Sequence, residues 1–199
     1  MKRNFLKLMG VLAIALCACN TSKEETPVIM NKDFMQLAAD RYSVRHFTSQ
    51  PVEQDKINLI LEAGKLAPTA VNSQPQKIYV IRSAEALAKA NAISPCIYGA
   101  PRVFLICYDD AHVCPRGTGT YGEIDCSIVI THMMLEAANL GIGTCPVGYF
   151  QPDEVIKTFG LPEGIHPVLL MPFGYAADDA VPSEMHTTFR PMDEMVEYL

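Results

Sequence analysis

Residues 77–108 contain three segments in succession: KIYVIR (77–82), SAEALAKANA (83–92) and RVFLICY (102–108). The first and last segments are rich in β-branched and aromatic residues, which favour strands. The middle segment is dominated by residues that favour helices. A strand, a helix and a second strand in this order predict a sheet that is covered by helices.

The longest apolar-periodic segment is residues 122–140, which we interpret as a central helix. Gly141 is placed to end this helix, because glycine readily adopts the left-handed conformation found there. The residues that recur at helical spacing are Ile124, Ile128, Thr131, Leu135 and Ala138.

The remaining chain alternates helices with strands and shows no internal repeat or long linker after residue 30. We therefore expect an α+β fold with one domain over residues 31–199. Further helices are predicted over 33–39, 53–66 and 152–159, a further strand over 166–174, and a short helical stretch or arm over 190–199.

The N-terminus has the pattern of a secretory leader. Basic residues precede an uncharged run from Leu8 to Ala18, which is too short to span a bilayer. The following LCAC (16–19) resembles a bacterial lipoprotein cleavage box, which predicts a signal peptide over 1–18 and a lipid on Cys19. Residues 19–30 are then a flexible tether, and the protein is expected in the cell envelope, anchored to a membrane at a periplasmic or outer face. An ordinary cleaved leader is the alternative.

Charge and cysteine content exclude two classes of function. The chain of 199 residues has a formal net charge of −6, which disfavours binding to nucleic acid phosphates. His112 and Cys114 form an H-x-C pair, but no second ligand pair follows at zinc spacing, so no metal site is expected. Five cysteines follow Cys19 without a C-x-x-C pair, and we expect mostly buried thiols.

The segment RYSVRHF (41–47) places two guanidinium groups, a hydroxyl and turn amides close together. Arginine offers a rigid fork of donors that matches phosphate, so the segment indicates an anion site. A solvated basic turn is the alternative.

Two loops have the composition of a ligand site. In APTAVNSQP (67–75), small residues allow close approach to the backbone, and Asn72 and Gln74 offer amide groups suited to the edge of a heterocycle. In GIGTCPVGY (141–149), glycines let the backbone itself meet a flat ligand, but the spacing of a Rossmann motif is missing. An ordinary helix-to-strand loop is the alternative for residues 67–75.

Taken in order, R-Y-S-x-R-x-F, A-P-T-A-x-N-x-Q-P, G-I-G-T-C-P-V-G and F-R-P (189–191) resemble the FMN-dependent nitroreductase family. The resemblance implies a central, mostly antiparallel sheet flanked by helices, and a homodimer with FMN at the interface. It also implies ping-pong transfer of hydride from NAD(P)H, or another donor, through flavin N5 to a nitroaromatic, a quinone or a similar small acceptor. No catalytic side chain is then required, because the reaction depends on positioning and on tuning of the flavin.

The same resemblance assigns roles to individual residues. Arg41 and Ser43, joined by Arg190, would bind the FMN phosphate, and Arg45 would lie at the N1/O2 edge of the flavin. One backbone N–H of Val147 or Gly148 would point at N5. The expected FMN-binding set is Arg41, Tyr42, Ser43, Arg45, Pro68, Thr69, Ala70, Asn72, Gln74, Pro146, Val147, Gly148 and Arg190, with residues 68–70 often supplied by the partner subunit.

The resemblance also implies that the long helices of the two subunits pack together, and we place Ile128, Met133, Met134 and Leu135 near that contact. A place in the core of one protomer is the alternative for these residues. The family commonly has Trp where this chain has Gln76 and Pro146, which leaves the acceptor open. Alternative functions are a reductive dehalogenase or a flavin-fragmenting enzyme of the same fold, and a non-enzymatic flavin- or ligand-binding lipoprotein of the envelope.

Overall fold

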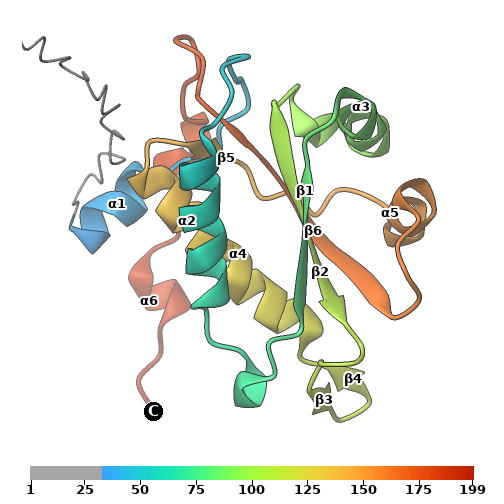
Figure 1. Cartoon of the computed structure of the whole chain (residues 1–199). Coiled ribbons are helices and arrows are strands. Elements are labelled where there is room, and N and C mark those ends of the chain that lie inside the picture. The colour runs from blue at the N-terminus through green and yellow to red at the C-terminus, as the bar shows by residue number, and fades with distance from the viewer. Residues whose placement is uncertain (1–32) are drawn as a thin grey trace, which may run out of the picture.

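The structure, a computed structural model, describes residues 33–199. The expected leader (1–18) and tether (19–30), with Cys19, lie outside the described residues. Three layers are seen in Figure 1, with helices on both sides of a sheet whose paired strands are all antiparallel. This confirms the predicted α+β fold. The strands follow the order β1 (Gln76–Ile81), β2 (Arg102–Asp109), β6 (Ile165–Gly174) and β5 (Gly143–Thr144).

The central strand β2 is buried on both faces of the sheet. Its side chains alternate, so that Phe104 and Ile106 join one core cluster while Val103, Leu105 and Cys107 join the other. This double burial explains why RVFLICY is a continuous apolar run rather than an alternation of apolar and polar residues.

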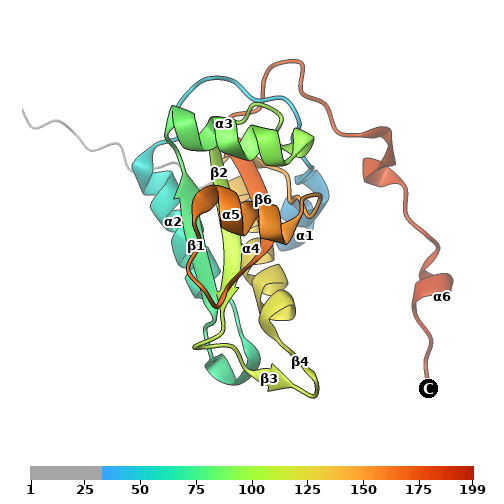
Figure 2. The same ribbon diagram turned by 90° about the vertical axis from the view of Figure 1, so that its right-hand side faces the viewer.

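One face of the sheet is covered by α1 (Phe34–Asp40), α2 (Gln54–Lys65) and α4 (Gly122–Asn139). The other face is covered by α3 (Ala84–Ile93) and α5 (Pro152–Phe159), as Figure 2 shows. The short elements are η1 (Ala70–Asn72), η2 (Pro95–Ile97), β3 (Pro115–Arg116), β4 (Gly119–Thr120), η3 (Glu184–Thr187) and α6 (Met192–Met195).

Close packing fixes α4 against the sheet and against α2. A Cβ added at Gly64 of α2 would lie 2.8 Å from Met133 Cγ of α4, so these helices approach more closely than a larger residue allows. Beneath them, the rings of Phe104 and Phe173 stack with centroids 4.1 Å apart. The long helix is therefore held rigidly over β2 and β6.

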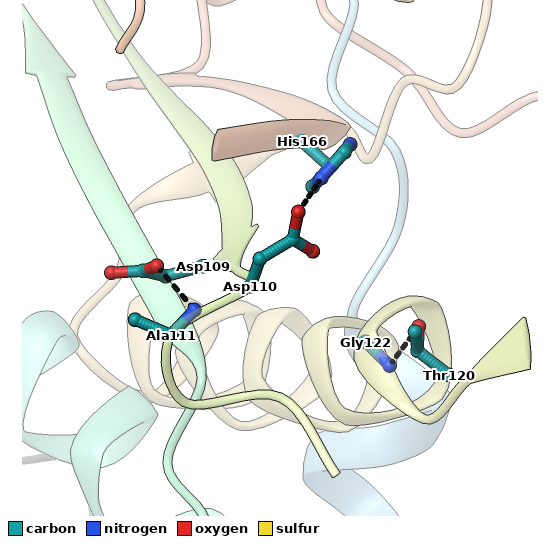
Figure 3. Close-up of polar contacts among 6 residues, drawn as sticks. All are labelled: Asp109, Asp110, Ala111, Thr120, Gly122 and His166. Carbon is teal, nitrogen blue, oxygen red and sulfur yellow. Dashed lines mark hydrogen bonds and ion pairs between the residues drawn. The ribbon is translucent and has the colours of Figure 1, made fainter. Parts of the chain in front are cut away.

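The turn that leads into α4 is fixed by polar contacts at the end of β2 (Figure 3). Asp110 Oδ2 lies 2.8 Å from His166 Nε2, which links this turn to the start of β6. Thr120 Oγ1 accepts a 3.2 Å hydrogen bond from the Gly122 N–H, where α4 begins. The turn after β2 is thus tied to the start of β6, and Thr120 fixes the backbone at the start of α4.

The residues at the predicted helical spacing do not form the buried side of α4. Ile124 is 40% exposed, Thr131 is also exposed, and Ile128 is only partly buried. Periodicity could not choose between the two sides, because α4 is apolar on both. The helix buries instead a side formed by Cys126, Val129, Ile130, Met133 and Ala137, so Met133 belongs to the core of its own protomer and not to a subunit contact.

The C-terminal residues leave the body of the protein as an arm (Figure 2). This arm contains α6 and ends in an extended segment, as the sequence predicted. Residues 187–199 are all exposed, among them the apolar Phe189 and Tyr198. The arm therefore presents apolar side chains that its own protomer does not cover.

The five cysteines of the described region are free thiols. Cys107, Cys126 and Cys145 are buried as expected, whereas Cys96 and Cys114 are only partly buried. Burial raises the pKa of the Cys107 and Cys126 thiols to about 12. Within residues 33–199, no helix combines the length and the apolar character needed to cross a bilayer.

Candidate functional site

The segment after α1 is joined directly to the segment after α4. Ser43 and Thr144 form a parallel bridge, and the Val44 N–H donates a 2.9 Å hydrogen bond to the Thr144 carbonyl. The contact depends on Gly143, because a Cβ there would lie 2.6 Å from Val44 Cγ2. The structure thus brings together two motifs that are about a hundred residues apart in the sequence.

A polar cavity of about 230 Å³ opens beside this junction and is lined by Arg41, Tyr42, Ser43, Arg45, Ser183, Met185 and His186. Within residues 33–199, no carboxylate forms an ion pair with Arg41 or Arg45. Arg45 Nη1 donates a 3.1 Å hydrogen bond to the Ser43 carbonyl, which fixes its position. Two guanidinium groups at a cavity without a carboxylate partner fit an anion such as a phosphate.

Arg190 is not among the residues that line this cavity, because it lies on the exposed arm. Its predicted contact with the phosphate is therefore not formed within one protomer. His186 reaches the cavity instead, with Nε2 3.1 Å from the Ala39 carbonyl and its ring edge-on to Tyr42. Nothing in the sequence around His186 marks it as part of a site.

The strand-like segment after β5 leaves the Gly148 N–H available as a backbone donor. Val147 pairs with Leu170 through both of its backbone groups, and the Val147 N–H donates to the Leu170 carbonyl at 2.8 Å. The Gly148 N–H has no partner among the described residues. Since Gly148 is exposed and a Cβ there would meet only Leu169 Cδ2 at 3.9 Å, the backbone is open to a ligand at this point. Of the two predicted donors, only Gly148 is free.

Two residues that the sequence did not single out lie beside Arg45. The pKa of the Tyr98 hydroxyl is raised, mainly by a hydrogen bond with the Cys96 thiol and by burial. A hydrogen bond from Arg45 opposes this shift in part. Burial also raises the pKa of the Cys145 thiol. The positive charge of Arg45 and a hydrogen bond with Ser43 lower this pKa, but by less than burial raises it. The raised pKa values favour the neutral forms of Tyr98 and Cys145, so neither group supplies a negative charge to Arg45.

The loop over residues 67–75 has an unusual backbone. Val71, Asn72 and Gln74 have φ values of 49°, 57° and 50°, in the left-handed region that non-glycine residues rarely adopt. The Gln74 N–H donates to Thr69 Oγ1 at 3.0 Å, and Val71 is 85% exposed. Strain of this kind is found mostly where function requires a particular backbone shape.

This loop and the Arg41 cavity lie at opposite ends of α4. The Ala70 N–H donates to Asp125 Oδ1 in the first turn of α4, whereas Thr144, which pairs with Ser43, follows the last turn. A helix of 18 residues is about 27 Å long. Figure 1 shows the same separation. The residues predicted to bind the cofactor are therefore divided within one protomer into two groups, which we call half-sites. One contains Arg41 to Arg45 and Pro146 to Gly148, and the other contains Pro68 to Gln74.

Replacing Gly143 by Ala should destabilise the junction between the two motifs. The added methyl group overlaps Val44, so we expect Gly143→Ala to lower the free energy of unfolding by about 1–3 kcal/mol. Urea unfolding followed by circular dichroism measures this loss. The matched control is Gly119→Ala, whose Cβ would meet only the Arg116 carbonyl at 3.8 Å and should change stability by less than about 0.5 kcal/mol. Equal stabilities of the two variants would contradict the steric argument.

Comparison with known proteins identifies the fold and the family. The model of the nitroreductase family matches residues 38–96 and 88–175. A nitroreductase family protein from Clostridium difficile 630 is 36% identical, with a TM-score of 0.78 over 84% of this chain and 98% of that one. A Bacillus subtilis protein named FMN reductase [NAD(P)H] is 28% identical. The matched region covers 70% of this chain and 64% of the length of that protein.

A crystal structure from Exiguobacterium sibiricum, solved in complex with FMN, shares the fold with a TM-score of 0.74 at 22% identity. It covers 84% of this chain and 98% of its own. The family model spans more than half of the present sequence, and its matched region contains Arg41 to Arg45, the strained loop and the segment around Gly148. The chain therefore belongs to the nitroreductase family.

Proposed function

We propose that the protein is a homodimeric, FMN-dependent oxidoreductase that takes reducing equivalents from NAD(P)H and passes them to a small acceptor such as a nitroaromatic or a quinone. The observation that carries the proposal is the pair of half-sites at opposite ends of α4. Support also comes from the similar FMN reductase of B. subtilis and from the E. sibiricum structure with FMN.

A homodimer explains why the half-sites are separate. If two copies pack their α4 helices side by side in antiparallel orientation, the 67–75 loop of each meets the Arg41 cavity of the other. The exposed side of α4 suits such packing, because it forms a shallow, mainly apolar groove. The exposed apolar arm is a second surface that a partner subunit would cover. The groove is lined by Glu123, Ile124, Ser127, Ile128, Thr131 and His132.

The residues of the first half-site fit FMN. Arg41 and Ser43 would bind the phosphate, joined by Arg190 from an arm, and Arg45 would place its positive charge at the N1/O2 edge of the ring. The free N–H of Gly148 would face N5. Bound FMN would supply reversible two-electron chemistry, and the chain's own contribution is to bind, orient and charge-stabilise the ring.

The second half-site completes the cofactor site from the other subunit. The partner subunit's Asn72 and Gln74 would present amide groups to the edge of the ring, while Pro68, Thr69 and Ala70 of the same loop would pack beside it. These roles follow from the exposed position of the loop and from its fixed backbone shape. The acceptor would enter where Gln76 and Pro146 stand in place of the bulkier Trp common in the family.

Binding of FMN is the first test. Purified protein reconstituted with FMN should retain flavin absorbance through gel filtration, and NADH or NADPH should bleach it under anaerobic conditions. Arg45→Ala should raise the Kd for FMN by about tenfold or more, since a charged hydrogen-bond donor is lost. Arg82→Ala, which removes an exposed charge on another part of the surface, is the control. A wild-type protein that elutes without flavin would refute the proposal.

A mixing experiment tests whether each site is shared between subunits. Arg45→Ala and Asn72→Ala homodimers should both be impaired in NAD(P)H oxidation, because each lacks one half of both sites. Unfolding and refolding them together should restore about a quarter of all sites, since half of the dimers are then mixed and each mixed dimer has one intact site. No recovery, with mixed dimers verified by mass spectrometry, would place both residues in the same protomer's site.

Location in the cell envelope, through a lipid on Cys19, forms part of the proposal and rests on the LCAC segment. Cys19→Ser should shift the protein from the membrane fraction to the soluble fraction, as immunoblotting of cell fractions would show. Unchanged membrane retention would exclude a lipid anchor. Because free NAD(P)H is expected to be scarce outside the cytoplasm, anaerobic reduction by a panel of donors is needed to identify the electron source.

A further inference from the structure

The first turn of α4 contains a buried carboxylate with an unusual set of contacts. Asp125 is 2% exposed, and its Oδ1 accepts a 2.9 Å hydrogen bond from the Ala70 N–H. Its Oδ2 is buried and has no partner among the described residues. An acidic side chain in a first turn is favoured by the helix dipole. Glu123 gains the same benefit while exposed, so the dipole does not explain why Asp125 is buried.

The hydrogen bond from the Ala70 N–H gives a reason for the burial of Asp125. Ala70 begins the run in which Val71, Asn72 and Gln74 take positive φ values. Such a run relaxes unless the surrounding structure holds it. Two backbone hydrogen bonds lie within the loop, from Asn72 to the Thr69 carbonyl and from Ser73 to the Ala70 carbonyl. Two side-chain oxygens also accept from its amides: Asp125 binds the Ala70 N–H before Val71, and Thr69 Oγ1 binds the Gln74 N–H at the end of the run. Both bonds go to backbone amides, so they fix the shape of the loop rather than the rotamer of one side chain.

We propose that Asp125 is a positioning residue that, together with Thr69, holds the 69–74 loop in the strained shape in which it contacts FMN bound to the partner subunit. The inference rests on the proposed function. Asp125 itself is buried beneath the loop and acts only through the Ala70 amide. Because the carboxylate belongs to α4, the same helix that separates the two half-sites also positions the loop.

The test compares Asp125→Ala with Cys126→Ala. Cys126 is the next residue of α4, is fully buried, and has no hydrogen bond to the loop, so its truncation reports on packing alone. Asp125→Ala should raise the Kd for FMN about tenfold or more, measured by quenching of flavin fluorescence, since a charge-assisted hydrogen bond is lost. It should also speed hydrogen exchange at the Ala70 amide. Cys126→Ala should do neither. Equal FMN affinity in the two variants would overturn the proposal.

Two further variants separate positioning from general destabilisation. Asp125→Asn retains a carbonyl oxygen that can accept from Ala70, and it should recover most of the affinity that Asp125→Ala loses. Thr69→Val keeps the shape of the side chain but removes the acceptor for Gln74, so it should expose the Gln74 amide to exchange and weaken FMN binding in the same direction. If Asp125→Ala does not fold, these variants decide: unchanged FMN affinity in Thr69→Val contradicts a held loop.

Failure of this inference can be told apart from failure of the proposed function. If the wild-type protein binds no FMN, the proposed function fails, whereas exchange at Ala70 and Gln74 still reports whether Asp125 and Thr69 hold the loop. If the wild-type protein binds FMN and Asp125→Ala binds it equally well, only the positioning role is refuted.

Discussion

The packing of α4 across β2 and β6 is the constraint on which the rest of the structure depends. The buried side chains of Cys126, Val129 and Met133 hold the helix in the core, and Gly64 allows α2 to pack closely against it. A helix held in this way is a rigid spacer of about 27 Å. The two groups of predicted cofactor-binding residues lie at its two ends. One side of the helix packs on the core, and the exposed groove runs along the other side of its N-terminal half.

Each end of the spacer is fixed by a different kind of contact. At the C-terminal end the contact is steric, since Gly143 leaves room for Val44 and lets Ser43 pair with Thr144. At the N-terminal end it is electrostatic, since Asp125 accepts from the Ala70 amide. The sheet then decides which backbone donors remain free. The Val147 N–H donates to Leu170 of β6, whereas the Gly148 N–H remains without a partner among the described residues.

Local signals in the sequence predicted the elements well and their mutual placement poorly. KIYVIR and RVFLICY are strands within one residue of the expected bounds, because β-branched runs between breakers have few other solutions. The positive φ of Val71 could not be predicted, because a β-branched residue disfavours it. The contacts that hold it include the hydrogen bond from the Ala70 N–H to Asp125, which lies 55 residues later in the sequence. Asp125 escaped notice because an acidic residue in a first helical turn already has an ordinary explanation.

The apolar residues on the outer side of α4 are informative. A helix that only covers a core is expected to be polar on its outer side. The outer side here contains Ile124 and Ile128, and periodicity could not rank this side against the buried one. In the proposed homodimer both sides are buried, one by the sheet and one by a second α4. One cause then explains why apolar residues lie on both sides of α4 and why the proposed site is divided into two halves. The sequence of this helix serves both the contact with the sheet and the contact between subunits.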